Sequence, residues 1–491
     1  MFRDVTGERG AGLPDPVVVP LAEVLVGLCA EANPLSVHHP AVKGVFEGAR
    51  EAALAAVDPG NAVKNHVRLE DEVLHVGGRE YDLSRYEHVY VGGIGKASVQ
   101  MAKALEDILG DGITEGVVNT SYGSTRGIEL SRIKINEVAH QAPDQAGVDG
   151  SKEILDLAKK AGEGDLFLFV VSGGGSDTFL SPVEPDVNVY AKFIKDLKGI
   201  IGDIKKVNCV RKHVDVVKGG QLAREISPAD SATLILSDVK DDPLSIIASG
   251  PTVPDESSFT EAKAIIDEME AKGGFVPASI REHIEKGARA EIPDTPKEGD
   301  PIFGRNQNVL VGNNRMALDA AKQNLEGNGF GVELIPEPVS GDVNEFANTL
   351  TQKADALSQT ITKPTVILAG GEVTVAVNKD STGAGGRGST LALCMAQRME
   401  GRSDRAFMTF GTDGVDFYAG HGGAMVDGNT ILEIQDLGMP LDDRVVYGDS
   451  YPPLDRLGVS ILCEPTGTNV MDVYMMVVMP KRPAQLQPSS I

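Results

Sequence analysis

The segment "LFLFVVSGGGSDT", residues 166–178, joins six consecutive apolar residues to three consecutive glycines. An unbroken apolar run of this kind is typical of a parallel strand that helices cover on both faces. Because glycine has no Cβ, Gly173, Gly174 and Gly175 let another group approach the backbone closely. The segment therefore predicts a buried strand that ends either in an anion cradle at a helix N-terminus or in a tight turn that binds nothing.

The same pattern recurs along the chain and indicates the fold class. Apolar runs alternate with segments of helical periodicity, such as residues 97–109 and 315–327, which favours an α/β architecture with parallel strands. The runs that we expect to form buried strands are residues 88–91, 166–171, 233–237, 308–312, 365–370 and 406–411.

The length of the chain and one break in its pattern suggest two domains. A chain of 491 residues is too long for one ordinary hydrophobic core. Residues 291–304 are rich in proline, glycine and charge, which is typical of a domain boundary. We therefore expect a loosely ordered extension at 1–33, a larger N-terminal domain at 34–300 and a smaller C-terminal domain at 301–485.

The charge balance limits the classes of partner. The chain has 46 Lys and Arg against 71 Asp and Glu, which gives a formal net charge of −25 at pH 7. A surface this acidic repels nucleic acids and anionic membranes, so we expect neither as a partner. To bind an anionic substrate, such a protein has to gather its cations locally.

Cysteine spacing and hydropathy indicate the compartment. The four cysteines lie far apart and lack the spacing of zinc or redox motifs. The N-terminus lacks the charged-then-apolar pattern of a secretory signal, and no apolar run approaches the roughly 18 residues of a membrane span. We therefore expect a cytoplasmic protein.

Small and polar residues follow five of the expected strands. In an open parallel sheet, the carboxyl ends of all strands lie on one edge, where ligands bind. We therefore expect these five segments to form one binding site along a single sheet edge. They are residues 92–96, 172–177, 238–242, 371–372 and 412–416.

Lys96 closes the segment "GGIGK" where a helix is expected to begin. From that position its ammonium can reach a phosphate bound to the N–H groups of the loop. The segment is not a P-loop, because Tyr90 stands where that motif needs glycine and Ala97 where it needs Ser or Thr. The alternative is a surface lysine that completes a turn.

A basic segment at residues 208–225 is the local cation cluster that an acidic protein needs for an anion. If this segment is helical, Arg211 and Lys218 are seven residues apart and share a face. The alternative is an ordinary solvated basic surface.

The segment "GAGGRGSTLAL", residues 383–393, has the glycine spacing of a dinucleotide fingerprint, and Asp413 follows at a suitable distance. An NAD-dependent enzyme is therefore a rival hypothesis. The expected strand at 373–377 ends too early for it, and Arg387 would crowd a pyrophosphate. An arginine in a glycine loop is better suited to stabilising a transferring phosphoryl group.

Carboxylates after the strands are candidate Mg²⁺ ligands, because Mg²⁺ prefers a few carboxylates together with substrate phosphates. For each aspartate, the alternative is the N-cap of the next helix. His140 and His421 could act in acid–base catalysis, but in such positions they are more often loop or core residues. The four candidate carboxylates are Asp238, Asp241, Asp413 and Asp416.

Eight segments, in order across residues 90–473, resemble the class II glycerate kinases, also called the glycerate 2-kinase or MOFRL family. They are "VGGIGKAS", "SGGGSDTFLSP", "NCVRKHVDVVKGGQLA", "LSDVKDDPLSIIASGPTVPD", "GGEVTV", "GAGGRGSTLAL", "GTDGVDF" and "PTGTNVMDV". The resemblance implies ATP-dependent phosphorylation of D-glycerate at its 2-hydroxyl to give 2-phosphoglycerate. It also implies an active site in the cleft between a larger Rossmann-like N-terminal domain and a smaller α/β, MOFRL-type C-terminal domain.

The resemblance places the lysine of the family at Lys96 and its glycine-loop arginine at Arg387. The chain departs from the family pattern at residues 388–390, in "AHQAPD" (139–144) and at Phe417, all on the expected substrate side. A kinase for a related small hydroxy acid therefore remains an alternative. NAD(P)H-dependent hydroxypyruvate reductase, a label that some family members carry, is another, and a ligand-binding protein without catalysis is a third.

We expect Lys96, Arg387, Asp238 and Asp413 to be catalytic, and Asp238 and Asp413 to hold Mg²⁺. The expected partners are ATP and a small hydroxy acid, and a homo-oligomer remains open. The residues that we expect to bind nucleotide or substrate anions are Gly93, Gly95, Ser172, Gly173, Gly174, Gly175, Ser176, Arg211, Lys218, Gly385 and Gly386.

Overall fold

The computed structural model describes residues 20–30, 34–417 and 420–481. Most of the expected N-terminal extension, residues 1–19 and 31–33, lies outside this description. Within it, residues Leu21–Ala30 form helix α1, so the expectation of a loosely ordered segment is wrong there. The reason is amphipathicity, because Ala22 and Leu25 are buried against the rest of the protein.

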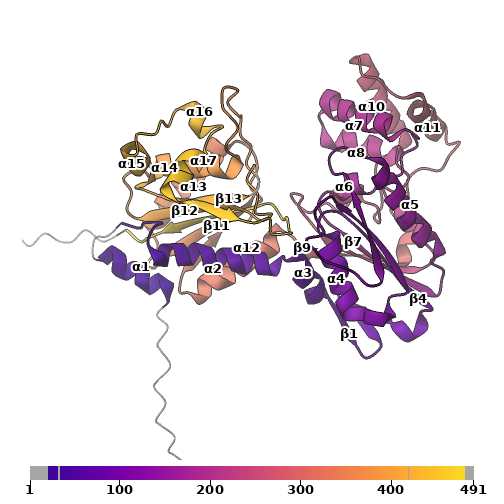
Figure 1. Ribbon diagram of the computed structural model, residues 1–491, viewed down its shortest axis with the longest axis horizontal. Helices are drawn as coiled ribbons and strands as arrows, with labels where there is room; N and C mark the ends of the chain where they lie inside the picture. Colours follow the sequence, from indigo (N-terminus) through magenta and orange to yellow (C-terminus); the bar gives the residue numbers. More distant parts are fainter. Residues whose placement is uncertain (1–19, 31–33, 418–419, 482–491) are drawn as a thin grey trace, which may run out of the picture.

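The chain forms two α/β domains, each around a six-stranded sheet (Figure 1). The N-terminal sheet is entirely parallel, as the apolar runs predicted, and its strand order is β6-β5-β4-β7-β8-β9. Its strands are β4 (His88–Ile94), β5 (Glu115–Ser121), β6 (Ile133–Val138), β7 (Asp165–Val171), β8 (Asp230–Leu236) and β9 (Asn306–Gly312).

Strand β7 shows why this sheet needs continuous apolar runs. Its Leu168 packs in one core with Val99 of α4 (Ser98–Leu109). Its Phe169 points to the other face, in a core with Ile154 of α5 (Gln145–Lys160). Both faces are therefore buried. The predicted helix at 97–109 is confirmed as α4.

Other elements of the N-terminal domain extend from this sheet. A separate core holds together a helical cluster above the sheet in Figure 1. The helices of that cluster are α7 (Val187–Ile201), α8 (Ile204–His213), α10 (Phe259–Ala271) and α11 (Ala278–Ala288). The remaining elements are α3 (Pro59–His66), α6 (Gly175–Thr178), α9 (Gln221–Ile226) and the antiparallel sheet β1 (Val67–Glu70), β2 (Val73–Val76) and β3 (Arg79–Asp82).

The C-terminal sheet is mixed, so the expectation of parallel strands is wrong for this domain. Its order is β10-β11-β15-β12-β13-β14, and β15 runs antiparallel between β11 and β12. Every residue of β15 is buried, like those of the parallel strands, because helices cover both faces. An unbroken apolar run therefore indicates that a strand is buried on both faces, but it does not indicate the direction of the strand. The strands are β10 (Gly331–Leu334), β11 (Thr365–Gly371), β12 (Arg405–Gly411), β13 (Gly420–Asp427), β14 (Ser460–Cys463) and β15 (Asp472–Val478).

Helices α2 and α12 cover one face of this sheet, and α13 and α14 cover the other (Figure 1). The predicted helix at 315–327 is confirmed as α12. The expected strand at 373–377 is absent, and Thr374 makes only an isolated bridge to Asp342. The helices of this domain are α2 (Pro40–Ala56), α12 (Asn314–Gly327), α13 (Val343–Ser358), α14 (Arg387–Met399), α15 (Thr430–Asp436), α16 (Asp443–Val446) and α17 (Tyr451–Leu457).

The chain crosses between the domains at places other than the predicted boundary at 300/301. Strand β9 follows that boundary but pairs with β8 of the N-terminal sheet. Helix α2 precedes the N-terminal sheet but packs on α12 of the C-terminal domain. The crossings therefore lie after α2, near Val57, and between β9 and α12.

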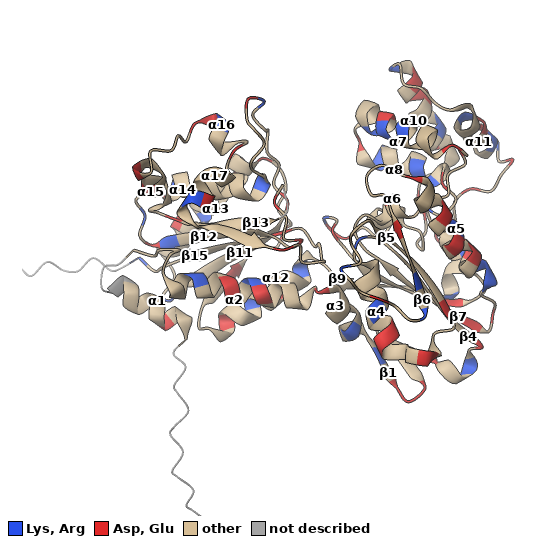
Figure 2. Ribbon diagram, in the orientation of Figure 1, with Lys and Arg blue, Asp and Glu red and all other residues tan. Residues whose placement is uncertain are grey.

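Charged residues of both signs are interspersed over the helices of both domains (Figure 2). The large negative charge is therefore spread out in this view and does not form one acidic face. Among the helices of the described ranges, none has both the length and the apolar content to span a membrane.

Candidate active site

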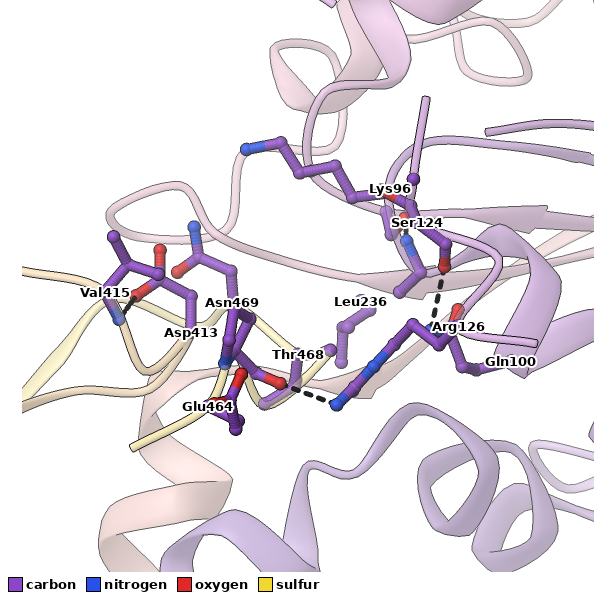
Figure 3. A pocket seen from close by; sticks show the side chains of 16 residues that line it. Lys96, Gln100, Ser124, Arg126, Leu236, Asp413, Val415, Glu464, Thr468 and Asn469 are labelled. Carbon is purple, nitrogen blue, oxygen red and sulfur yellow. Dashed lines mark hydrogen bonds between the residues drawn. The ribbon is translucent and has the colours of Figure 1, made fainter. Parts of the chain in front are cut away.

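A cavity of about 430 Å³ lies between the two domains (Figure 3). The five predicted site segments therefore belong to two sheets, and the expectation of one sheet edge is wrong. The carboxyl ends of β4, β7 and β8 bring residues from the N-terminal domain, and the end of β12 brings Asp413 and Val415 from the other side. The remaining C-terminal lining comes from the segment 464–469 between β14 and β15.

The two glycine loops of the N-terminal domain interlock. The backbone N–H of Lys96 donates to the carbonyl of Gly173 at 2.9 Å, and the N–H of Ala97 donates to Oγ of Ser172 at 3.0 Å. Gly95 has φ of 101°, and a Cβ at this position would overlap Ser172. Glycine is therefore required at 95 for backbone conformation and for close approach.

Close packing also explains the glycines at the tip of the loop after β7. A Cβ on Gly173 would overlap the carboxylate of Asp238. A Cβ on Gly174, whose φ is 83°, would lie 2.9 Å from Cδ2 of His140. The N–H groups of Gly173 and Gly174 donate to no acceptor in the part of the chain that the structure describes. The loop is thus a packed turn that also leaves two donors for a ligand.

Lys96 is exposed and forms no ion pair with any described residue. Figure 3 shows its side chain extending from the N-terminal domain toward the side of the cavity on which Asp413 and Asn469 lie. An unpaired ammonium in so acidic a protein is well placed to bind an anion.

Asp238 and Asp413 belong to different domains but influence each other electrostatically. Burial raises the pKa of Asp238, the charges of Glu372 and Asp413 raise it further, and Lys96 opposes them. Burial likewise raises the pKa of Asp413, while Arg387 and Lys96 favour its ionised form. The charges of Asp238, Asp413 and Lys96 therefore act on one another across the cleft.

No group of three or more His, Cys, Asp or Glu side chains suited to a metal ion occurs among the described residues. Mg²⁺ commonly binds to one or two carboxylates and completes its coordination with water and substrate phosphates. Asp238 and Asp413, whose charges interact across the cleft, would supply the carboxylates for that mode of binding.

Arg387 is the first residue of α14, and two carboxylates hold its guanidinium. Nε and Nη2 donate to the two oxygens of Asp472 at 2.7 and 2.9 Å, and Nη2 also donates to Glu372 at 2.7 Å. Burial would lower the pKa of Arg387, but these carboxylates outweigh it and raise that pKa. Burial raises the pKa of Asp472 to about 6, even though Arg387 favours its ionised form. The arginine is therefore rigidly oriented beside the cleft.

The N-terminus of α14 already binds a carboxylate of the protein, which argues against the dinucleotide interpretation. The N–H groups of Gly388 and Ser389 donate to Asp416 at 2.9 and 2.7 Å. Asp416 therefore caps the N-terminus of α14, which is the alternative stated above for each candidate aspartate. A Cβ on Gly386 would overlap Asp416, and one on Gly385 would overlap a neighbouring serine. Packing within the protein explains both glycines, and a pyrophosphate would have to displace Asp416.

The basic segment 208–225 is not one helix, because α8 ends at His213 and Lys218 lies in the following turns. Arg211 and Lys218 nevertheless converge, since both donate to the carbonyl of Ser176, at 2.9 and 3.0 Å. Arg211 pairs with Asp177 at 2.7 Å, and Lys218 is completely buried. Both cations therefore stabilise the short helix α6 through the carbonyl of Ser176, and neither of them lines the cavity.

His213 makes the stability of the helical cluster depend on pH. Its Nδ1 and Nε2 donate to the carbonyl of Cys209 at 2.8 Å and to Asp294 at 2.9 Å. Burial alone would lower the pKa of His213, but these hydrogen bonds outweigh it and raise the pKa to about 9. The stabilisation is therefore complete below about pH 6.5, the pKa of unfolded histidine, and is lost as the pH rises through 9.

We expect the free energy of unfolding to fall by about 3 kcal/mol between pH 6.5 and 9 through this group. Urea unfolding, followed by circular dichroism at both pH values, measures the change. His213→Gln should remove most of this dependence, whereas His75→Gln in β2 should retain it. Equal pH dependence in His213→Gln and the wild type would contradict the prediction.

Arg126 is a cavity residue that sequence reasoning missed, and it bridges the domains (Figure 3). Its guanidinium donates to the carbonyl of Pro465 at 2.6 Å and to that of Thr466. Its φ is 52°, an uncommon conformation for a residue other than glycine. The sequence marks residues 465–473 as a motif, but no local pattern identifies the arginine that reaches this segment across the cleft.

Replacing Arg126 with alanine is expected to loosen segment 464–469 without unfolding either domain. Losing two hydrogen bonds at an exposed site costs about 1 kcal/mol locally, which corresponds to roughly fivefold faster amide exchange in that segment. Hydrogen–deuterium exchange with peptide resolution measures this, and Arg132→Ala, which removes an exposed ion pair within the N-terminal domain, is the control. Unchanged exchange at 464–469 would show that Arg126 does not hold the segment.

Comparison with known proteins places this arrangement in a family. Residues 45–285 match the family described as Domain of unknown function (DUF4147), and residues 365–472 match the MOFRL family. The glycerate 2-kinase of Pyrococcus horikoshii is 35% identical over 434 residues, which cover 88% of this chain and 96% of that protein. The D-glycerate 2-kinase of Thermotoga maritima is 33% identical over 396 residues, which cover 80% and 91%.

The likeness extends to the three-dimensional structure. The crystal structure of glycerate kinase from Thermotoga maritima aligns with a TM-score of 0.79 at 30% sequence identity, and the alignment covers 90% of this chain and 100% of that one. Both domains, and hence the cleft between them, fall within the match. The chain therefore belongs to the DUF4147/MOFRL family of glycerate kinases.

Proposed function

We propose that this protein is an ATP-dependent kinase that phosphorylates the 2-hydroxyl of D-glycerate to give 2-phosphoglycerate. The observation that carries the proposal is the interdomain cleft lined by Lys96 and Asp413, where the charges of Asp238 and Arg387 also act. The names and the extent of the related proteins support the substrate and the product.

The cations of this chain bind and neutralise the phosphates. Lys96 and the N–H groups of Gly173 and Gly174 bind phosphate oxygens of the nucleotide. Arg387 uses three N–H bonds for Asp472 and Glu372, and its Nη1 donates to no described residue, so it remains for the transferring phosphoryl group. Positioning and charge stabilisation of this kind account for most of the catalysis in phosphoryl transfer.

Asp238 and Asp413 would hold the metal ion, which we take to be Mg²⁺. When bound, Mg²⁺ neutralises charge on the β- and γ-phosphates. The two carboxylates come from different domains, so they position the nucleotide relative to both halves of the cleft. During transfer, the acceptor oxygen forms a bond to the γ-phosphorus while the bond from that phosphorus to the departing ADP breaks.

Release of ADP from Mg·ATP in the presence of D-glycerate tests the proposal, with ³¹P NMR to identify the phosphorylated hydroxyl. A 2-phosphoglycerate signal that grows with ADP would support it. ADP release with another small hydroxy acid, but not with D-glycerate, would favour a kinase for a related substrate. The departures from the family pattern at 388–390, 139–144 and 417 are consistent with that alternative. Oxidation of NADH by hydroxypyruvate without ADP release would overturn the kinase, and nucleotide binding without any turnover would favour a binding protein.

A further inference from the structure

His140 lies next to the glycine loop although its own strand is at the far edge of the sheet. It follows β6, which β5 and β4 separate from β7. Neighbouring strands are about 4.8 Å apart, so the loop after β6 has to span roughly 14 Å to reach the loop after β7. The imidazole nevertheless lies against Gly174, where a Cβ would be 2.9 Å from Cδ2 and 3.1 Å from Nε2.

The same glycine brings His140 next to Lys96. Cγ of Lys96 lies 3.4 Å from the position of that Cβ, so the two side chains flank one backbone position. The ring is half-buried, and its nitrogens make no hydrogen bond to any described residue. A half-buried imidazole with both nitrogens available beside Lys96 is placed to hydrogen-bond a ligand that binds at the glycine loop.

The charges around His140 define its protonation state. Burial lowers its pKa, Lys96 and Lys198 of α7 lower it further, and Asp177 opposes them. The ring is therefore neutral at pH 7, and one nitrogen carries a lone pair that can accept a proton.

The same surroundings attract an anion. Lys96 and Lys198 form no ion pair with a described residue, and the nearby carboxylate of Asp177 already pairs with Arg211 at 2.7 Å. Positive charge next to His140 is therefore left uncompensated in a strongly acidic protein. A small carboxylate bound there would neutralise it.

We propose that the acceptor hydroxy acid binds on the His140 side of Gly174, with its carboxylate near Lys96 in the positive field of Lys198 and its hydroxyl hydrogen-bonded to His140, which accepts the hydroxyl proton. This inference rests on the proposed kinase function. As the oxygen–phosphorus bond forms and the bond to ADP breaks, the O–H bond of the acceptor breaks and an N–H bond forms on the imidazole. The imidazolium then loses this proton to water.

His140→Gln tests the proton acceptor, because an amide keeps a hydrogen bond but cannot titrate at neutral pH. We expect kcat to fall about a hundredfold with little change in KM for ATP. The acid limb of kcat/KM for D-glycerate should also move to lower pH, because neutral His140 is required in the wild type and not in the variant. His75→Gln is the control, and a His140→Gln enzyme within twofold of wild-type kcat with an unchanged pH profile would overturn the proposal.

Lys198→Ala tests the carboxylate subsite. We expect KM for D-glycerate to rise about tenfold while kcat and KM for ATP change little, because the charge of Lys198 attracts the acceptor carboxylate. Lys195→Ala, three residues earlier on the same helix, is the control. Equal KM values for D-glycerate in the wild type and Lys198→Ala would overturn this part of the proposal.

Binding without turnover separates this inference from the proposed reaction. Titration calorimetry of D-glycerate, with and without Mg·ADP, should give a dissociation constant for the wild type that His140→Ala and Lys198→Ala each raise. A wild type without kinase activity would disprove the proposed function, and wild-type affinity in both variants would disprove the subsite even in an active enzyme. Absence of D-glycerate binding to the wild type would disprove the subsite as well.

Discussion

Arg387→Ala is expected to lower kcat about a hundredfold to a thousandfold, the usual loss when one preorganised electrostatic donor is removed. Asp472 and Glu372 hold the guanidinium in place, so the enzyme spends no reorganisation energy at the moment of transfer. Arg387→Lys keeps the charge but cannot bind Asp472 through two parallel hydrogen bonds, so it should recover only part of the rate. Steady-state kinetics of ADP release measure both variants.

The same substitution should also lower stability, which the sequence alone did not lead us to expect. It leaves the carboxylate of Asp472, which is 4% exposed, without its cation. The cost is about 2 kcal/mol, less than for a fully buried pair, because the Arg387 side chain is itself 36% exposed.

The stability loss in Arg387→Ala should depend on pH with a definite sign. The pKa of Asp472 is already raised to about 6 and rises further without the arginine, so the folded state binds a proton more tightly than the unfolded state. Stability therefore falls as the pH rises from about 4 through this folded pKa. Urea unfolding at pH 5.5 and 8 measures the effect. Arg398→Ala, at the other end of α14, is the control, and wild-type kcat in Arg387→Ala would disprove the catalytic role.

Lys96→Ala should cause a similar loss of kcat, about a hundredfold or more, but with no loss of stability. The ammonium is exposed and forms no ion pair with a described residue, so its removal leaves no buried partner behind. Lys96→Arg should restore charge but not geometry, because a planar guanidinium differs from a compact ammonium in its hydrogen bonds.

Kinetics and thermal unfolding of Lys96→Ala, measured side by side, check this prediction. Lys103→Ala on α4, the helix that follows Lys96, is a matched control, because Lys103 pairs with Asp107 outside the cavity. A large drop in the unfolding temperature of Lys96→Ala would show that the lysine has a structural role instead. A wild-type kcat in Lys96→Ala would show that Lys96 does not bind the transferred phosphate.

Local patterns in the sequence predicted much of the architecture. The glycine loop after residues 166–171, the helices at 97–109 and 315–327 and the parallel N-terminal sheet all appear in the structure. Continuous apolar runs and glycine spacing record burial and backbone conformation, which depend on residues that are near in the chain.

The site was harder to predict, because residues far apart in the chain create it. Arg211 and Lys218 had the expected chemistry but are buried beneath α6. Arg126 offered no local signal, although it bridges the domains. His140 was a candidate for acid–base catalysis, but nothing in the sequence indicated that it reaches Gly174 from the edge of the sheet.

By itself, the sequence determined where six of the strands lie, where glycine is required and that cations stand at 96 and 387. Only the tertiary structure decided that β15 runs antiparallel, that α2 joins the C-terminal domain and that two sheet edges face each other across the cleft. The physical reason is that burial and turn geometry act over a few residues. Strand direction, domain partnership and the electrostatic coupling of Asp238 with Asp413 depend instead on contacts between segments far apart in the chain.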